Sequence, residues 1–208
     1  MSHSNDTLLL GYWAQPVRAQ PIRYILEIGK YPYKENQYKT PAEWFEKDSM
    51  SLGLQFPNLP YIIKGDLKIT ESHNVAQYAI EVSNQCHLQG TGQQKYKIEN
   101  VRLVADEVMM KVFGAIKLSG EAQTNEFKSN IIPKLTLLQK HLGNKVYFFD
   151  NKLSVADIYT YSGLFILKNK FPEQYQPFAA TFDPFMKNFE SIPQIKEYQS
   201  SDRFPKLR

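Results

Sequence analysis

Apolar residues near the start of the chain form one short run and then a helical stripe. The run Leu8–Tyr12 predicts a short buried strand. Ile22, Ile25 and Leu26 follow at three- and four-residue spacings, which places them on one face of a helix that ends at Gly29.

Further short runs and a second helix complete this part of the pattern. Strands are predicted at 33–38, at 61–64 and at 67–70, the last two joined by a tight turn. A helix is predicted over 72–81, with the Ser72 side chain as its N-cap. This order of strands and helices favours a small α/β domain with a mixed sheet, βαβ followed by ββα.

The second part of the chain shows helical spacing throughout. One helix is predicted over 96–116 and a second over 125–142, in which Pro133 marks a kink or a late start. Another begins after Ser154, and a fourth is predicted to start at Asp183–Pro184, because proline suits the first helical turn. An all-α domain is therefore expected after the α/β domain.

The start of the third of these helices has a specific signal. Ser154 is followed three residues later by Asp157, which predicts a capping box in which the two residues satisfy each other's main-chain N–H groups. Asp157 is therefore predicted to stabilise the fold and to take no part in catalysis.

The boundary between the two parts is predicted at the polar, glycine-containing stretch 89–95. It separates an N-terminal domain over 7–88 from a C-terminal domain over 96–208. At 208 residues, the chain is long enough for each domain to bury a core.

Composition and charge exclude several classes of function. The net charge of +4 is spread along the chain, so no basic patch predicts a nucleic-acid partner. No apolar run is long enough to span a membrane, and Met1–Thr7 lacks the pattern of a signal peptide. The four histidines show no ligand spacing, so no metal site is predicted. Cys86 is the one cysteine, so no disulfide framework is expected, which favours a cytoplasmic protein. Cys86 itself is expected to be a packed small side chain.

The segment Leu54–Tyr61 carries the strongest local signal. Pro60 cannot donate to a sheet ladder, so it is expected at a strand entrance or edge. A cis Leu59–Pro60 bond would turn the main chain of Leu59 towards a peptide-like ligand, whereas a trans bond would make Pro60 an ordinary loop proline. The helix that starts at Ser72 follows closely, and a helix N-terminus is suited to an anion.

Several motifs follow one another along nearly the whole chain: Leu10-Gly11-Tyr12-Trp13, Leu52-Gly53-Leu54, Phe56-Pro57-Asn58-Leu59-Pro60-Tyr61, Lys68-Ile69-Thr70-Glu71-Ser72, the Ser154–Asp157 box and Ser200-Ser201-x-Arg203-Phe204. Taken in order, they resemble the cytosolic glutathione S-transferase family. The set is most similar to the mu class, whereas the loop Arg18–Arg23 is more similar to the sigma and alpha classes. The resemblance implies a thioredoxin-like N-terminal domain, an all-α C-terminal domain and a homodimer.

The resemblance also assigns the chemistry. It implies that Tyr12 donates a hydrogen bond to the sulfur of glutathione and favours the thiolate, because a free thiol with a pKa of about 8.5 is only a few per cent ionised at neutral pH. Arg18 matches the arginine that supports the thiolate in the sigma and alpha classes. From the residues alone, Tyr12 could instead cap the sheet edge, and Arg18 could be a solvated loop charge.

Further residues match positions that hold glutathione in the family. Leu59 is expected to pair main chain to main chain with the cysteinyl unit, Ser72 to receive the γ-glutamyl carboxylate, and Glu71 to accept from the γ-glutamyl ammonium. Asn58 and Trp44 match contacts to the glycyl end, although Trp44 could also be a packed aromatic. The remaining expected glutathione-binding residues are Trp13, Lys47 and Pro60, with Lys47 the nearest match to the glycyl lysine.

The acceptor pocket and the subunit contact follow from the same resemblance. The residues expected to line the acceptor pocket are Met110, Phe113, Gly114 and Leu118. Phe56 is expected to insert between helices of the partner subunit. In related classes, an aspartate from this region enters the active site of the partner subunit. Here a methionine occupies that position, so Asp106 and Glu107 are predicted to be solvated helix charges.

The predicted reaction is attack of the glutathione thiolate on a small apolar electrophile, as in detoxification. Glutathione is the co-substrate, and no other cofactor is expected. Two alternatives stay open. One is a glutathione-dependent isomerase of the sigma prostaglandin-synthase type, for which the loop Arg18–Arg23 argues. The other is a non-catalytic binding or structural protein on the same scaffold, against which the intact set of Tyr12, Leu59–Pro60 and Ser72 argues.

Overall fold

The computed structural model describes residues 7–207 and divides the chain into two compact units. The first comprises Met1–Gln85 with Ser201–Arg208, and the second comprises Cys86–Ser200. The start of the chain, where no signal-peptide pattern is expected, lies outside the described residues up to Asp6.

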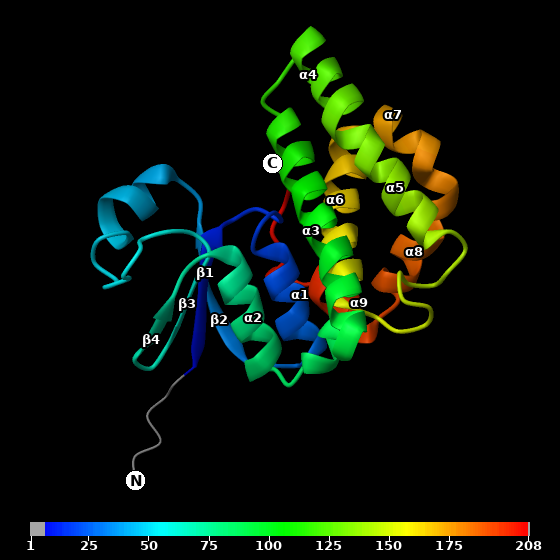
Figure 1. Cartoon of the computed structure of the whole chain (residues 1–208). Coiled ribbons are helices and arrows are strands. Elements are labelled where there is room, and N and C mark those ends of the chain that lie inside the picture. The colour runs from blue at the N-terminus through cyan, green and yellow to red at the C-terminus, as the bar shows by residue number, and fades with distance from the viewer. Residues whose placement is uncertain (1–6, 208) are drawn as a thin grey trace. The chain divides into compact units, whose positions relative to one another are not determined.

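The first unit contains a four-stranded mixed sheet with two helices on one face (Figure 1). The strands are β1 (Leu8–Trp13), β2 (Tyr33–Tyr38), β3 (Tyr61–Lys64) and β4 (Leu67–Ile69), in the sheet order β2-β1-β3-β4. Strands β1 and β2 are parallel, and the other two pairings are antiparallel. Helices α1 (Gln20–Ile28) and α2 (Ser72–Val82) lie side by side (Figure 1). This order of elements confirms the predicted thioredoxin-like arrangement.

The apolar pattern explains which faces are buried. Leu8 and Leu10 of β1 and the predicted stripe of Ile22, Ile25 and Leu26 on α1 have no exposed surface. Residues spaced by three and four share a helix face, so these three side chains form one apolar stripe. The helix is also buried outside the stripe, since Arg23 and Tyr24 have no exposed surface.

Gly11 allows an aromatic cluster to form over the sheet. A Cβ atom at Gly11 would lie 2.1 Å from the ring of Tyr61, its partner residue on β3, so only glycine leaves room for that ring. Trp44 stacks on Tyr61 with ring centroids 5.9 Å apart, and the Tyr61 hydroxyl lies 2.9 Å from that of Tyr38. Tyr38 donates to Asp48 at 2.6 Å, and burial raises the pKa of Tyr38, which keeps its proton in place. The cluster therefore anchors the π-helical segment Glu43–Asp48, which the sequence pattern did not predict.

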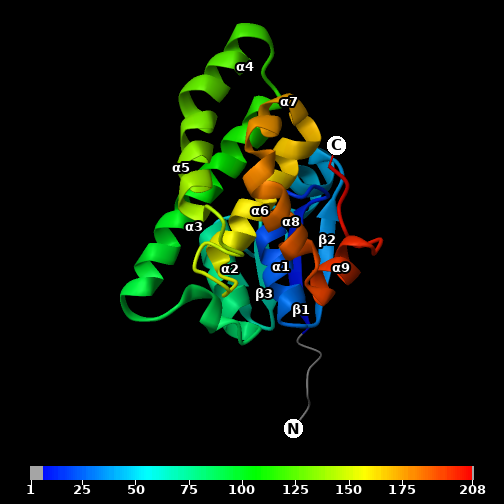
Figure 2. The same cartoon turned by 90° about the vertical axis from the view of Figure 1, so that its right-hand side faces the viewer.

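The second unit is built from helices (Figure 2). They are α3 (Gly92–Ala115), α4 (Gly120–Glu126), α5 (Ile132–Leu142), α6 (Val155–Lys170), α7 (Pro172–Tyr175), α8 (Ala179–Glu190) and α9 (Pro193–Gln199), with 3₁₀ turns at Cys86–Gln89 and Gln176–Phe178 and a π-helical segment at Phe127–Ile131. Helix α6 is buried along most of its length. It approaches α3 closely at Gly163, where an added Cβ would lie 3.3 Å from the Cα of Met109.

The helix bounds differ from the sequence pattern at three places. Helix α3 begins at Gly92, inside the predicted linker. The sequence pattern missed this start because the first turn of the helix is polar and shows no apolar period. The second helical stretch begins at Gly120 and passes through a π-helical segment before Pro133, which lies in the first turn of α5. Helix α8 begins at Ala179, where it continues a 3₁₀ turn, so the predicted start at Asp183–Pro184 is wrong and Pro184 lies inside the helix.

The end of the chain groups with the first unit, although the sequence pattern assigned it to the helical domain. The guanidinium group of Arg203 donates to Glu27 at 2.6 and 3.1 Å and lies 5.7 Å from the ring centroid of Tyr33. Its main-chain oxygen accepts from Gln37 at 2.9 Å. Charge and hydrogen bonding, which leave no apolar period in the sequence, account for this placement.

The capping box at the start of α6 is present, as predicted. One carboxylate oxygen of Asp157 accepts from the main-chain N–H of Ser154 at 2.8 Å and from its hydroxyl at 2.6 Å. The other accepts from the N–H of Phe148 at 2.8 Å, which also ties the preceding loop to the helix. Asp157 has no exposed surface, and burial raises its pKa to about 6 against the opposing effect of these donors.

Replacing Asp157 with alanine is expected to lower the free energy of unfolding by about 2–3 kcal/mol, because buried donors lose their acceptor. Thermal denaturation would measure this loss. Turnover per folded molecule should stay near the wild-type value. A loss of turnover at normal stability would show that Asp157 acts on the chemistry instead.

Candidate functional site

Tyr12 lies near the carboxyl end of β1, the edge at which ligands of open α/β sheets bind. Tyr12 is 5% exposed, and its hydroxyl oxygen accepts a hydrogen bond from the main-chain N–H of Arg18 at 3.3 Å. A phenol that accepts one hydrogen bond can donate another, and the first bond strengthens the second. The loop after β1 therefore prepares the Tyr12 hydroxyl to donate to an anion.

Arg18 joins Tyr12 to the start of α2. Its side chain is half-buried, and Nη1 lies 3.5 Å from the hydroxyl oxygen of Ser72. Tyr12, Arg18 and Ser72 thus meet although 54 positions separate the last two in sequence. The site combines a phenol, a guanidinium and a helix N-terminus, all of which favour a bound negative charge.

Ser72 is the first residue of α2 and does not serve as its N-cap, so that prediction is wrong. Glu71 occupies the cap with φ 68° and ψ 116°, and its side chain makes no capping bond. A non-glycine residue in this region costs of the order of 1–3 kcal/mol and is typical of binding sites. The first amide N–H groups of α2 have no partner within the helix, as at every helix start.

The loop before β3 is linked to the same helix start. The Leu59–Pro60 bond is cis, and Pro60 directly precedes β3, as the entrance position requires. Asn58 accepts from the N–H of Leu59 at 2.8 Å and donates to Glu71 at 2.9 Å. The expected partner of glutathione's cysteinyl unit, the Leu59 main chain, is therefore held beside Glu71 and Ser72 through one side chain.

The aromatic residues predicted for glutathione binding lie in two environments. Trp13 is half-buried, with ring centroids 6.2 Å from both Tyr38 and Phe45. Trp44 is only 3% exposed because it packs inside the aromatic cluster described above. Lys47 is exposed on the π-helical segment. The contacts of these three residues with glutathione stay predictions.

The residues predicted for the acceptor pocket belong to the second unit. Met110, Phe113 and Gly114 share one face of α3, because they are spaced by three and four residues. Met110 and Phe113 are half-buried, while Gly114 is exposed and has no atom within 4 Å of an added Cβ. Leu118 follows the helix and is 38% exposed. The four residues offer an apolar surface with open space at Gly114.

Two minor predictions are corrected. Cys86 is an exposed free cysteine and is not packed. Asp106 is only 9% exposed; it lies one helical turn after the buried Arg102 and interacts with its positive charge. Glu107, by contrast, is a surface charge that pairs with Lys134.

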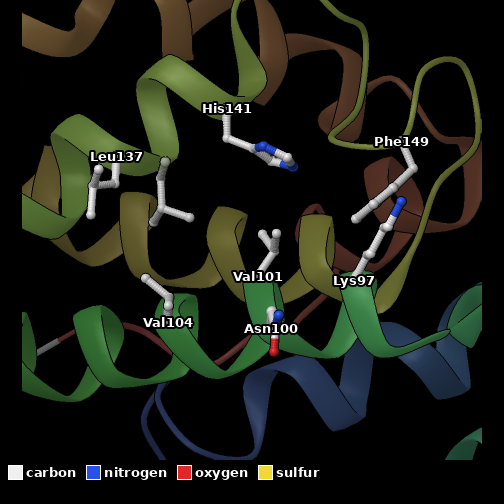
Figure 3. Close-up of a pocket in the computed structure, with 8 residues that line it drawn as sticks. Lys97, Asn100, Val101, Val104, Leu137, His141 and Phe149 are labelled. Atoms are coloured by element: carbon white, nitrogen blue, oxygen red, sulfur yellow. The ribbon is translucent and has the colours of Figure 1, made fainter. Parts of the chain in front are cut away.

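A hollow lies in the helical unit, between α3 and α5 (Figure 3). It has a volume of about 340 Å³. Lys97, Asn100, Val101 and Val104 line it from α3, and His141 extends over it from α5, as Figure 3 shows. The remaining lining residues are Leu137, Leu138 and Phe149. Burial and nearby Lys145 lower the pKa of His141, which favours its neutral form beside this apolar surface.

One residue of the first unit was missed as a site residue. Arg23 is fully buried on α1 and lies 5.8 Å from the ring centroid of Tyr12. Arginine is seldom fully buried unless it is paired, so an arginine next to the apolar stripe of this helix is a signal that could have identified Arg23 from the sequence.

Among residues 7–207, no helix combines the length and apolar character needed to cross a bilayer. In the same range, no group of three or more His, Cys, Asp or Glu side chains is arranged to hold a metal ion.

Known proteins are similar to this chain in both sequence and fold. A family model described as "Glutathione S-transferase, C-terminal domain" matches residues 106–202. Glutathione S-transferase B of Cavia porcellus is 30% identical over 205 residues, which cover 95% of this chain and 93% of that protein. Glutathione S-transferase Mu 1 of Mus musculus is 30% identical over 206 residues, covering 95% and 92%. The crystal structure of the glutathione S-transferase Blo t 8 has a TM-score of 0.75 and 24% identity, covering 94% of this chain and 93% of that one.

Proposed function

Because this chain belongs to the glutathione S-transferase family, we propose that it binds glutathione at Tyr12, Arg18 and Ser72 and transfers the thiolate to a small apolar electrophile. The convergence of these three residues at one sheet edge supports the proposal most directly. Among the classes of this family, the mu class fits its motifs best.

Tyr12 is proposed to activate the thiol of glutathione. A hydrogen bond to an anion is worth roughly 1.5–3 kcal/mol, which lowers a thiol pKa by about one to two units. Such a shift brings the pKa of the bound thiol close to neutral pH, where a large share is nucleophilic thiolate. Arg18 would add a positive charge nearby.

The rest of glutathione is proposed to lie along the loop before β3 and the start of α2. Leu59 would pair with the cysteinyl unit, which requires its N–H to exchange the side chain of Asn58 for the ligand. Ser72 and the amides behind it would hold the γ-glutamyl carboxylate, with Glu71 near the ammonium. The glycyl end would reach the segment that carries Trp44 and Lys47.

The electrophile is proposed to bind at Met110, Phe113, Gly114 and Leu118. Their side chains are apolar, and Gly114 leaves open space, so a small apolar molecule suits them better than a charged one. The proposed location of the enzyme is the cytoplasm.

An isomerase that uses glutathione without consuming it is the second candidate. The loop Arg18–Arg23 favours it, because this loop is similar to that of the sigma class, which includes prostaglandin synthases. The two candidates differ in stoichiometry: conjugation consumes one glutathione for each product, whereas isomerisation consumes none.

A panel of electrophiles incubated with the purified protein and glutathione tests the proposal. Conjugates should form above the uncatalysed rate, and glutathione should disappear at the rate at which they form. Product formation at constant glutathione would favour the isomerase. Binding of glutathione without turnover of any panel member would contradict conjugation.

A homodimer is also proposed, with Phe56 as the contact residue. Phe56 is 65% exposed in the loop before β3, where it has no core to fill. The hollow between α3 and α5 presents apolar side chains on the second unit (Figure 3). In a two-fold dimer, each Phe56 would enter the hollow of the other copy, so that the contact forms twice.

A further inference from the structure

Arg23 occupies the interior of the first unit, directly behind the proposed catalytic residue. It is fully buried on α1, and its guanidinium lies 5.8 Å from the ring centroid of Tyr12. We propose that Arg23 is a positioning residue, which holds the Tyr12 hydroxyl where it can bond to the glutathione sulfur. This inference rests on the proposed function of Tyr12.

All five N–H donors of Arg23 have acceptors. Nε donates to Glu35 at 2.6 Å and Nη2 lies 2.5 Å from the same carboxylate oxygen. Nη1 donates to the main-chain oxygen of Gln15 at 2.9 Å and to the side chain of Gln20 at 3.2 Å, and Nη2 reaches the main-chain oxygen of Trp13 at 3.3 Å. A guanidinium has five donors in a rigid plane, so this site uses its full capacity.

The two main-chain acceptors determine the position of Tyr12. Trp13 is the next residue after Tyr12, and Gln15 lies in the turn that leads to Arg18, whose N–H donates to the Tyr12 hydroxyl. Fixing the carbonyl groups of this turn therefore fixes both the tyrosine and the donor that polarises it. A shift of about 1 Å at a reacting group can lower the rate by about a hundredfold.

Glu35 anchors Arg23 from the neighbouring strand. It lies on β2, and its second carboxylate oxygen accepts from Gln37 at 3.0 Å. Gln37 is paired with Tyr12 across the sheet and also donates to the main chain of Arg203 at 2.9 Å. The buried ion pair of Arg23 and Glu35 thus attaches the turn after β1 to α1 and to β2. Gln37 extends this network to the last residues of the chain.

If Arg23 acts by positioning the Tyr12 hydroxyl, lysine cannot replace it. Its ammonium group carries three donors at one point, whereas the acceptors around Arg23 surround a plane. Arg23→Lys keeps the charge and loses the geometry, so it separates a positioning role from a simple effect of charge. The double variant Arg23→Gln with Glu35→Gln removes both charges together and avoids leaving a lone buried carboxylate.

The test measures the pH at which bound glutathione ionises, followed by thiolate absorbance in the ultraviolet. Arg23→Lys and the double variant should each raise this pH by about one unit, equal to a tenfold change in the ionisation constant. Conjugation at neutral pH should fall by a similar factor, with little change in glutathione affinity. Arg102→Lys is the matched control, because Arg102 is another buried arginine paired with a glutamate. It should change thermal stability without changing the ionisation.

The same variants in a Tyr12→Phe background show whether Arg23 acts through Tyr12. Their effect on ionisation should then disappear. The inference is overturned if Arg23→Lys ionises glutathione as wild type does, or if its effect persists without the tyrosine hydroxyl. If Tyr12→Phe alone leaves the ionisation unchanged, the proposed function of Tyr12 fails, and the role of Arg23 fails with it.

Discussion

Tyr12→Phe is expected to lower conjugation near neutral pH by about one to two orders of magnitude, because each 1.4 kcal/mol of lost stabilisation is about tenfold in rate. The variant keeps the aromatic ring and removes only the hydroxyl. Glutathione should still bind through Leu59 and Ser72. The pH at which bound glutathione ionises should rise towards that of the free thiol.

The comparison is made with glutathione saturating, because weaker binding would otherwise look like a slower chemical step. Tyr33→Phe is a suitable control, since the Tyr33 hydroxyl donates to Glu27 at 2.8 Å and is not expected to meet the substrate. It should leave the ionisation of glutathione unchanged. If Tyr12→Phe retains wild-type ionisation and turnover, Tyr12 is structural, and Arg18 becomes the leading candidate for activating the thiol.

Phe56→Ala is expected to weaken the proposed homodimer by about two to four orders of magnitude in its dissociation constant. Burial of one phenylalanine contributes roughly 1.5–3 kcal/mol, and a two-fold interface loses it twice, or about 3–6 kcal/mol. Analytical ultracentrifugation should show monomer at concentrations where the wild type is a dimer.

Phe45→Ala is the matched control, because Phe45 has the same 65% exposure and lies on the neighbouring π-helical segment. It should leave the dimer intact. A charged residue in the hollow, Val101→Glu, should dissociate the dimer as Phe56→Ala does. A dimer that persists in both Phe56→Ala and Val101→Glu would show that another surface joins the subunits.

Local sequence patterns predicted those helices that carry an apolar stripe or a capping signal. The stripe of Ile22, Ile25 and Leu26 predicted α1, and the spacing of Ser154 and Asp157 predicted the start of α6, because both depend on neighbours within one or two turns. The same logic failed at α8, whose start continues a 3₁₀ turn and carries no capping signal of its own.

The candidate site was predicted residue by residue from motif resemblance, and its assembly depended on tertiary contacts. Tyr12 and Ser72 meet through Arg18 because the sheet order β2-β1-β3-β4 brings the end of β1 to the start of α2. The sequence pattern placed Ser72 at the cap of α2, but the backbone of Glu71 takes that position. A one-residue difference of this kind depends on backbone dihedral angles, which side-chain identity does not determine.

By itself, the sequence indicated the family through the resemblance of its motifs. It also predicted most of the strands and helices, since these depend on local period. Only the tertiary structure decided which polar groups meet. Arg23 reaches Glu35 and the carbonyls of Trp13 and Gln15 from three different elements, and Arg203 returns to Glu27 from the far end of the chain. Such bonds join residues with no shared period, because a hydrogen bond needs only a donor and an acceptor brought within about 3 Å by the whole fold.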